Sequence, residues 1–371
     1  MSPVAGSSLL AQDRFARAAW SRVAEPGDVV AAEVISALGP VVALQRVAEG
    51  SDARHDRFRP RLEVLDVERD LEVGARFGVR LVCPGDEEWP RGLDDLQHPP
   101  YCLWVRGPLQ VGGACRRSAA VVGARSATAY GEMVATDLAA GLAERGFTIV
   151  SGAAFGIDAA AHRGALAVGG DTIAVLAGGV ERAYPAAHAT LIGRIADAGA
   201  VISEVAPGSA PTKTRFLQRN RLIATMSSGT VVVEAGLRSG SLNTARRAAE
   251  HARVVAAVPG PVTSMMSAGC HQAVRDGYAV LVTDAAEAAD AFGVLGHDAA
   301  SRPSGPSRPG DSLGENAARV MAALPLRRGV AVSRLVVSSG LAPLEVASAL
   351  GQLELKQLAE RHGEGWRARP G

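Results

Sequence analysis

The sequence predicts an α/β fold built on a doubly wound, mainly parallel β-sheet. Two observations predict it: short apolar runs recur with helical stretches between them, and each run is continuously apolar. Such runs indicate strands that are buried on both faces, as they are in parallel sheets covered by helices. The seven runs are residues 119–122, 148–150, 172–176, 200–202, 230–233, 254–258 and 279–282.

Composition sets limits on the whole chain. The 371 residues include 39 basic and 38 acidic side chains, a formal net charge of +1, and 47% are apolar. This length and composition predict two or three domains with a full core, and exclude wholesale disorder. The charge balance also excludes a globally basic surface that coats polyanions, so any nucleic-acid site must be a local patch.

The four cysteines are widely scattered and form no Cys-x-x-Cys pair. Their spacing argues against a zinc ribbon, a disulfide framework or a thioredoxin-type site, and favours a reducing compartment. No signal peptide is visible, and no run of about 18 apolar residues occurs. We therefore expect a cytoplasmic protein without a membrane span or a metal.

Residues 1–111 are expected to form a small N-terminal helical domain with a lead-in to the sheet. Helical periodicity covers residues 13–24 and 28–48, interrupted by Pro26-Gly27 and Gly39-Pro40. This pattern predicts a helical hairpin of the SAM or helix-hairpin-helix type. Such a turn can bind duplex phosphates, but 13 basic against 17 acidic residues favour a packing or partner role.

Residues 112–293 are expected to hold the sheet domain, and residues 294–312 a linker rich in Pro, Gly and Ser. The remaining segment, 313–371, is expected to form a separate small domain. It contains three short helical patterns and an extended tail with Trp366. This order predicts a winged-helix-like domain, and a generic helical appendage is the alternative.

Small residues follow several predicted strands. In doubly wound sheets, ligands bind beyond the carboxyl ends of the strands, where helix N-termini point outward. Small side chains there let a phosphate approach the backbone closely. The relevant residues are Gly123-Ala124-Arg125 after the first strand, Ser151-Gly152 after the second and Ser239-Gly240-Ser241 after the fifth.

The same turns argue against two common nucleotide-binding classes. A dinucleotide fingerprint needs Gly-x-Gly-x-x-Gly after the first strand, but Gly123 is followed by Ala124 and Arg125. The Arg125 cation favours a phosphate chain over a nicotinamide cofactor. The chain also lacks the Gly-x-x-x-x-Gly-Lys-Ser/Thr motif of P-loop NTPases. No cofactor is expected.

The segment 207–221 contains four cations and no acid. Its cations are Lys213, Arg215, Arg219 and Arg221, and Phe216 lies among them. Cations that follow a phosphate backbone beside an aromatic ring are features of single-strand sites, in which each stacked base contributes ~1–3 kcal/mol. A solvated loop that leads into a helix, with Phe216 as a core anchor, is equally compatible with the spacing.

Carboxylates and a histidine occur near the same edge. Asp158 and His162 are four residues apart on a predicted helix, where an N-terminal Asp and a structural His are favoured over a metal site. Glu204 and Glu234 follow strands and could contact ribose or act as a general base. The interpretation we favour is that they orient Arg219 or Arg221.

A series of motifs in a fixed order resembles the DNA-processing protein A family (DprA, also called Smf). The resemblance covers nearly all of the middle domain and extends less specifically to both flanks. Its most specific motifs are V-V-G-A-R at 121–125, S-G-A-A-F-G-I-D-A-A-A-H at 151–162, T-I-A-V-L-A-G-G at 172–179, F-L-Q-R-N-R-L-I-A at 216–224 and S-G-S-L-N-T-A at 239–245.

The resemblance implies a Rossmann-like domain that binds single-stranded DNA and loads the RecA recombinase onto it in natural transformation. It also implies a homodimer that acts as a mediator and not as an enzyme. By motif position, Arg125 would grip a phosphate, Ser151 and Gly152 would offer a hydroxyl and bare backbone, and Lys213 would meet the strand. The expected DNA site is Gly123, Arg125, Ser151, Gly152, Lys213, Phe216, Arg219, Asn220, Arg221, Ser239 and Gly240.

In that site Phe216 would stack on a base, and Arg219 and Arg221 would hold the loop or bind phosphate. The chain departs from the family pattern at Leu217, where Pro is frequent, and within 265–278. The alternative function is a nucleotide-processing enzyme similar to phosphoribohydrolases, with Glu234 acting on a ribose. Those enzymes carry a Pro-Gly-Gly-x-Gly-Thr loop, whereas this chain has Ser-Ser-Gly-Thr at 227–230.

Overall fold

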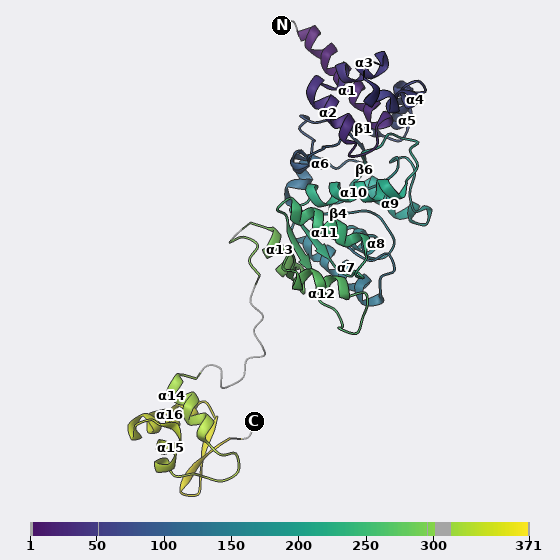
Figure 1. The fold of residues 1–371 in the computed structure, drawn as a ribbon. Helices are drawn as coiled ribbons and strands as arrows, with labels where there is room; N and C mark the ends of the chain where they lie inside the picture. The colour runs from purple at the N-terminus through teal and green to yellow at the C-terminus, as the bar shows by residue number, and fades with distance from the viewer. Residues whose placement is uncertain (1–2, 51, 295, 301–312, 370–371) are drawn as a thin grey trace. The chain divides into compact units, whose positions relative to one another are not determined.

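The computed structural model describes residues 3–50, 52–294, 296–300 and 313–369. The chain divides into two compact units, residues 1–300 and 301–371 (Figure 1). The predicted linker core at 301–312 lies outside the described residues.

The first unit is built on a nine-stranded sheet with the order β1-β2-β6-β5-β4-β3-β7-β8-β9. All seven predicted strands are present, and they pair in parallel. They are β3 (Ser118–Val122), β4 (Thr148–Ser151), β5 (Thr172–Val175), β6 (Ala200–Ser203), β7 (Gly229–Val232), β8 (Val254–Ala257) and β9 (Val280–Leu281). The chain runs outward from β3 through β4 to β6 and then returns to β7 on the other side of β3. That reversal is the topological switch point, where ligands of doubly wound sheets bind.

The sheet begins earlier in the chain than the sequence indicated. Strands β1 (Val79–Val82) and β2 (Leu103–Arg106) lie before residue 111, and β2 pairs antiparallel with both β1 and β6. Three of the four residues of β1, including Arg80, are only partly buried. An edge strand of this kind lacks the continuous apolar run that marks the seven central strands.

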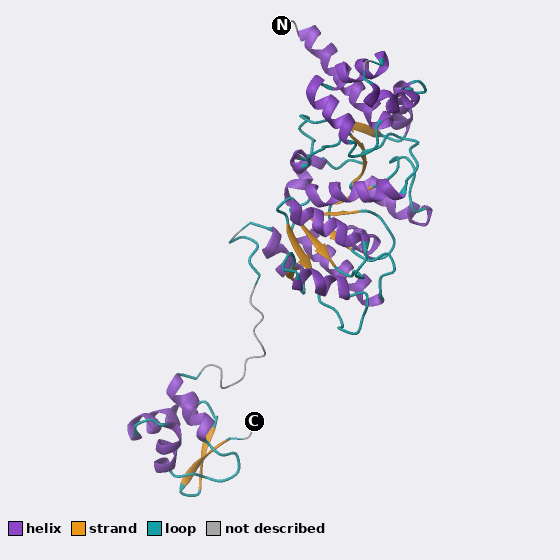
Figure 2. Ribbon diagram, viewed as in Figure 1, coloured by secondary structure: helices purple, strands orange, loops and turns teal. Residues whose placement is uncertain are grey.

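Helices cover both faces of the sheet (Figure 2). On β3, Ala120 and Val122 pack in one cluster with Leu222 of α10, whereas Ala119 and Val121 pack in another with Leu138 of α7. Successive side chains of a strand thus enter opposite cores, as the continuous apolar runs predicted. The helices are α7 (Ala129–Glu144), α8 (Ile157–Ala167), α9 (Ala189–Ala198), α10 (Lys213–Met226), α11 (Gly240–Glu250), α12 (Ala268–Arg275) and α13 (Ala285–Phe292).

The N-terminal helices pack around Trp20. Its ring is fully buried, donates from Nε1 to the Pro40 carbonyl at 3.0 Å, and meets Phe58 edge-on at 5.7 Å. Trp104 of β2 donates to the Ser21 hydroxyl at 3.1 Å, which ties these helices to the sheet. They are α1 (Pro3–Val23), α2 (Val29–Leu38), α3 (Pro40–Glu49), α4 (Arg59–Leu62) and α5 (Val67–Arg76).

Among the described residues, no single helix is long and apolar enough to cross a membrane. The pair α2 and α3, bent by 115° at its junction, meets the length and composition criterion together.

The second unit has the three predicted helices, and its extended tail forms a two-stranded antiparallel hairpin. Its core contains Leu335, Leu350, Leu353 and Trp366. The order of helices and strands agrees with the predicted order of elements. The winged-helix interpretation stays a prediction. The elements are α14 (Glu315–Ala323), α15 (Val332–Ser339), α16 (Pro343–Leu355), β10 (Ala359–His362) and β11 (Gly365–Ala368).

Candidate functional site

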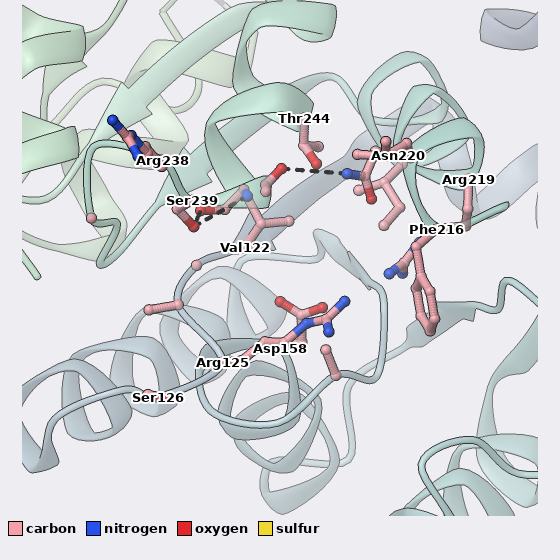
Figure 3. Close-up of a pocket in the computed structure, with 18 of the residues that line it drawn as sticks. Val122, Arg125, Ser126, Asp158, Phe216, Arg219, Asn220, Arg238, Ser239 and Thr244 are labelled. Carbon is pink, nitrogen blue, oxygen red and sulfur yellow. Dashed lines mark hydrogen bonds between the residues drawn. The ribbon is translucent and has the colours of Figure 1, made fainter. Parts of the chain in front are cut away.

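A pocket of about 540 Å³ opens where β3 and β7 end, at the switch point of the sheet. Figure 3 shows Phe216, Arg219 and Asn220 projecting from α10 on one side of it, with Arg125 and Asp158 below them. Seven of the expected site residues line the pocket: Gly123, Arg125, Phe216, Arg219, Asn220, Ser239 and Gly240. Ser151, Gly152, Lys213 and Arg221 do not.

The acid-free segment is only partly a loop. Lys213 begins α10, and the Thr212 hydroxyl caps the helix by accepting from the Arg215 amide at 3.2 Å. Because residues three or four apart share a helix face, Phe216, Arg219 and Asn220 turn together toward the pocket. The interpretation of a loop leading into a helix therefore holds for the backbone, but Phe216 is half-buried in the pocket wall and not a core anchor.

Two of the four cations in this segment form ion pairs with carboxylates. Arg215 forms an ion pair with Glu25 at 2.8 Å, and its hydrogen bonds lower the pKa of that carboxyl. Arg221 is buried, pairs with Glu204 and donates to the His98 carbonyl at 3.0 Å. The favoured role of Glu204 is thus confirmed, whereas a phosphate contact by Arg221 is wrong because its guanidinium is buried and paired.

Arg219 is also buried, with 6% of its surface exposed, although it borders the pocket. It donates to the Val175 carbonyl of β5 at 2.8 Å. Burial lowers its pKa to about 10, opposed by the nearby Asp158 carboxylate. The guanidinium therefore remains charged at neutral pH and is balanced by Asp158, whose own pKa burial raises.

The Arg219 guanidinium fills the space that a side chain at residue 152 would occupy. A Cβ at residue 152 would lie 1.6 Å from Nη1 of Arg219. Ser151 is fully buried, and its hydroxyl donates to the Val121 carbonyl at 2.7 Å. The expectation that these two residues offer a hydroxyl and bare backbone to a ligand is therefore wrong, because both are occupied by the protein itself.

Three exposed cations remain near the pocket: Arg125, Lys213 and Arg238. Within the described part of the chain, none of them forms an ion pair. The Arg125 guanidinium lies 5.1 Å from the centre of the Phe216 ring, and the centre of the Tyr184 ring lies 5.6 Å from that of Phe216. Phe216 thus lies close to both a cation and a second aromatic ring.

Sequence reasoning missed Arg238. It lines the pocket from the loop after β7 and directly precedes the predicted Ser239-Gly240 pair. The signal that could have found it was a lone cation at the end of a strand, as for Arg125. Ser239 caps α11, and Asn220 donates to the Gly240 carbonyl at 3.3 Å, as the dashed line in Figure 3 shows.

One glycine and one carboxylate, Gly123 and Glu234, support the turn after β3. A Cβ on Gly123 would lie 2.5 Å from the Ile157 side chain, so close packing of α8 requires glycine there. Glu234 is buried and accepts from the Thr128 amide at 2.9 Å and its hydroxyl at 2.6 Å. Glu234 therefore fixes the start of α7 and does not orient Arg219 or Arg221 as expected.

Asp158 and His162 of α8 are both buried. The Gly152 amide donates to Asp158 at 3.2 Å, and His162 Nδ1 contacts the Thr172 hydroxyl at 2.7 Å. Among the described residues, no group of three or more His, Cys, Asp or Glu side chains is placed to hold a metal ion. Both side chains therefore have the structural roles that the sequence favoured.

Comparison with known proteins gives one consistent family. The family model for DNA recombination-mediator protein A matches residues 80–293. The putative DNA processing protein DprA of Mycobacterium tuberculosis H37Rv is 46% identical over 368 residues, which cover 94% of this chain and 93% of the relative. Protein Smf of Escherichia coli K12 is 42% identical over 206 residues, or 55% of this chain and 54% of the relative.

Solved structures agree. DprA from Streptococcus pneumoniae has a TM-score of 0.64 and 31% identity, covering 76% of this chain and 98% of that chain. DNA processing protein A from Helicobacter pylori, described for its single-stranded DNA binding mode, has a TM-score of 0.51 and 28% identity. That match covers 56% of this chain and 93% of the other.

The burial of His162 should make the stability of the protein depend on pH. Burial lowers the pKa of His162 to about 3, so the folded chain stays unprotonated there while the unfolded chain binds a proton below about 6.5. Stability should fall as pH drops through this window, and His162→Gln should remove about 1.4 kcal/mol per pH unit of that slope between pH 5.5 and 4. Urea unfolding at several pH values measures the free energy of unfolding of both proteins. If it changes with pH by the same amount in the wild type and in His162→Gln, His162 is not buried in its neutral form.

Proposed function

Because the chain belongs to the DNA recombination-mediator protein A family, also called DprA or Smf, we propose that it binds single-stranded DNA in the switch-point pocket. The observation that carries the proposal is the half-buried Phe216 ring, which has the exposed Arg125 guanidinium 5.1 Å from its centre and shares its pocket with the exposed Arg238. Phosphates of a strand would meet Arg125, Lys213 and Arg238, while one base stacks on Phe216.

The aromatic ring favours a single strand over a duplex. A ring in a pocket wall can stack only on a base that is free of its own neighbours, and bases of a duplex are already stacked. Tyr184, which contacts Phe216 and is 49% exposed, offers a second ring beside the first. The single-stranded DNA binding described for the Helicobacter pylori relative supports the same assignment.

We infer a mediator and not an enzyme. A hydrolase of the phosphoribohydrolase type would need a free carboxylate at the ligand, but Glu234 accepts two hydrogen bonds from Thr128 and Glu204 is paired with Arg221. Asp158 lines the pocket, yet it is 6% exposed and accepts from the Gly152 amide at 3.2 Å. The pocket thus offers binding groups and no exposed general base among its lining residues.

The remaining parts of the proposal, a homodimer and RecA loading, rest on membership of the family. A cytoplasmic homodimer would hold the strand and load the RecA recombinase onto it, in natural transformation or in general recombination. No short motif marks the dimer or RecA surface, so no residue is assigned to either.

The exposed cations should set the salt dependence of binding. The variant Arg125→Ala/Lys213→Ala/Arg238→Ala should bind fluorescent oligo-dT more weakly than the wild type. Its slope of log affinity against log salt should fall by about 2, because each single-strand phosphate contact contributes about 0.7. Titrations at several salt concentrations measure this slope.

The matched control is Arg69→Ala/Arg76→Ala/Arg194→Ala, which removes three exposed arginines that do not line the pocket. It should leave the slope near that of the wild type. Equal slopes for all three proteins, or a wild type that fails to bind at low salt, would rule out the proposed site.

Replacement of Phe216 should separate stacking from charge. Phe216→Ala should weaken oligo-dT binding by about 1–3 kcal/mol, the contribution of one stacked base, with little change in the salt slope. Phe216→Tyr should keep most of the affinity, and Leu217→Ala, at the 50% exposed neighbour, serves as the control. An affinity unchanged in Phe216→Ala would show that no base stacks on this ring.

A further inference from the structure

A second cationic pocket, of about 360 Å³, lies at the opposite edge of the sheet. It is lined by Ser228 and Arg253, which directly precede β7 and β8, and by Arg116, which lies two residues before β3. Arg91 joins them from the short helix η2 (Arg91–Asp95), and Arg116 belongs to η3 (Cys115–Arg117). Three arginines from three segments thus line one cavity, and no Asp or Glu is among its lining residues.

Most of this charge is not neutralised by the protein. Arg253 pairs with Asp95. Arg91 and Arg116 are exposed, and within the described residues neither guanidinium has a hydrogen bond or an ion pair. Cys115 also lines the cavity, but burial raises its pKa to about 12, so it remains a neutral thiol. The cavity therefore has an excess of positive charge that a bound anion would balance.

Capping of a helix does not explain the arginines. The last turn of α10 ends beside the cavity, and cations often occur near helix C-termini because carbonyl groups there lack partners. Here, within the described residues, neither the Arg91 nor the Arg116 guanidinium donates to such a carbonyl. The Ser227 hydroxyl donates to one of these carbonyls, that of Ile223, at 3.0 Å.

The arginine-bearing segments are held in place by close backbone packing. A Cβ on Gly92 would lie 2.0 Å from the Thr225 carbonyl oxygen, and one on Gly112 would lie 2.8 Å from the Glu87 carbonyl oxygen. Glycine at these two positions lets η2 and the segment before η3 approach their neighbours closely. The backbone that bears Arg91 and Arg116 is therefore fixed before any ligand arrives, which lowers the entropic cost of binding.

We propose that Arg91, Arg116 and Arg253 form a second anion site, which binds a phosphate group. Guanidinium groups match the geometry of phosphate oxygens and bind them through paired hydrogen bonds. The ligand is either a small phosphorylated molecule or the phosphodiester backbone of a nucleic acid, since both present the same group. This site shares no lining residue with the switch-point pocket and is independent of the function proposed for it.

Pyrophosphate is a suitable probe for the full chain. To remove the first pocket, the titrations use an Arg125→Ala/Lys213→Ala/Arg238→Ala background, and calorimetry measures pyrophosphate affinity. Adding Arg91→Ala/Arg116→Ala should weaken binding at least tenfold, or by about 1.4 kcal/mol, because it removes charge-assisted hydrogen bonds to the phosphate. Adding Arg69→Ala/Arg76→Ala instead, at exposed arginines outside both pockets, should leave the affinity unchanged.

Competition identifies the source of the phosphate. Displacement of pyrophosphate by oligo-dT in the same background would assign the site to nucleic acid, and no displacement would assign it to a small phosphorylated molecule. The proposal is overturned if pyrophosphate does not bind the background protein, or if the Arg91/Arg116 and Arg69/Arg76 variants bind it equally. Thermal unfolding of each variant verifies that the fold is intact.

Discussion

The burial of the Arg219 guanidinium against Gly152 is the contact on which the geometry of the switch-point pocket depends. It is possible only because residue 152 lacks a side chain, and it joins α10 to the carboxyl ends of β4 and β5 through the Val175 carbonyl. Asp158, in the first turn of α8, balances the buried charge. Because this contact fixes the orientation of α10, Phe216 and Asn220, which are three and one residues from Arg219 in the helix, point into the pocket.

The same packing separates structural cations from those available to a ligand. Arg215 and Arg221 are paired with carboxylates from other parts of the chain, and Arg219 is buried. Of the four cations in the segment 207–221, only Lys213 is exposed and, within the described residues, forms no ion pair. Strand-end residues Arg125 and Arg238 add the remaining charge, so a chain of net charge +1 still presents a local cationic surface.

The sequence predicted what local patterns determine. The seven central strands were recognisable because burial on both faces demands continuous apolar runs, and β1 escaped because it is a partly exposed edge strand that carries Arg80. The small residues at the strand ends located the pocket. The partners of the arginines could not be read in the same way, because Glu25 is 190 residues from Arg215 in the chain, and Gly152 appeared to be open backbone until Arg219 was placed over it.

Photochemical cross-linking tests the central claim, that a single strand passes over Phe216, most directly. Oligo-dT carrying 5-iodouracil would be bound to the full chain, irradiated, and the attached peptides identified by mass spectrometry. We expect attachment at Phe216 or Tyr184, the two rings in contact at the pocket. Cross-links confined to other regions, such as residues 313–369, with none on α10 or beside it, would contradict the account.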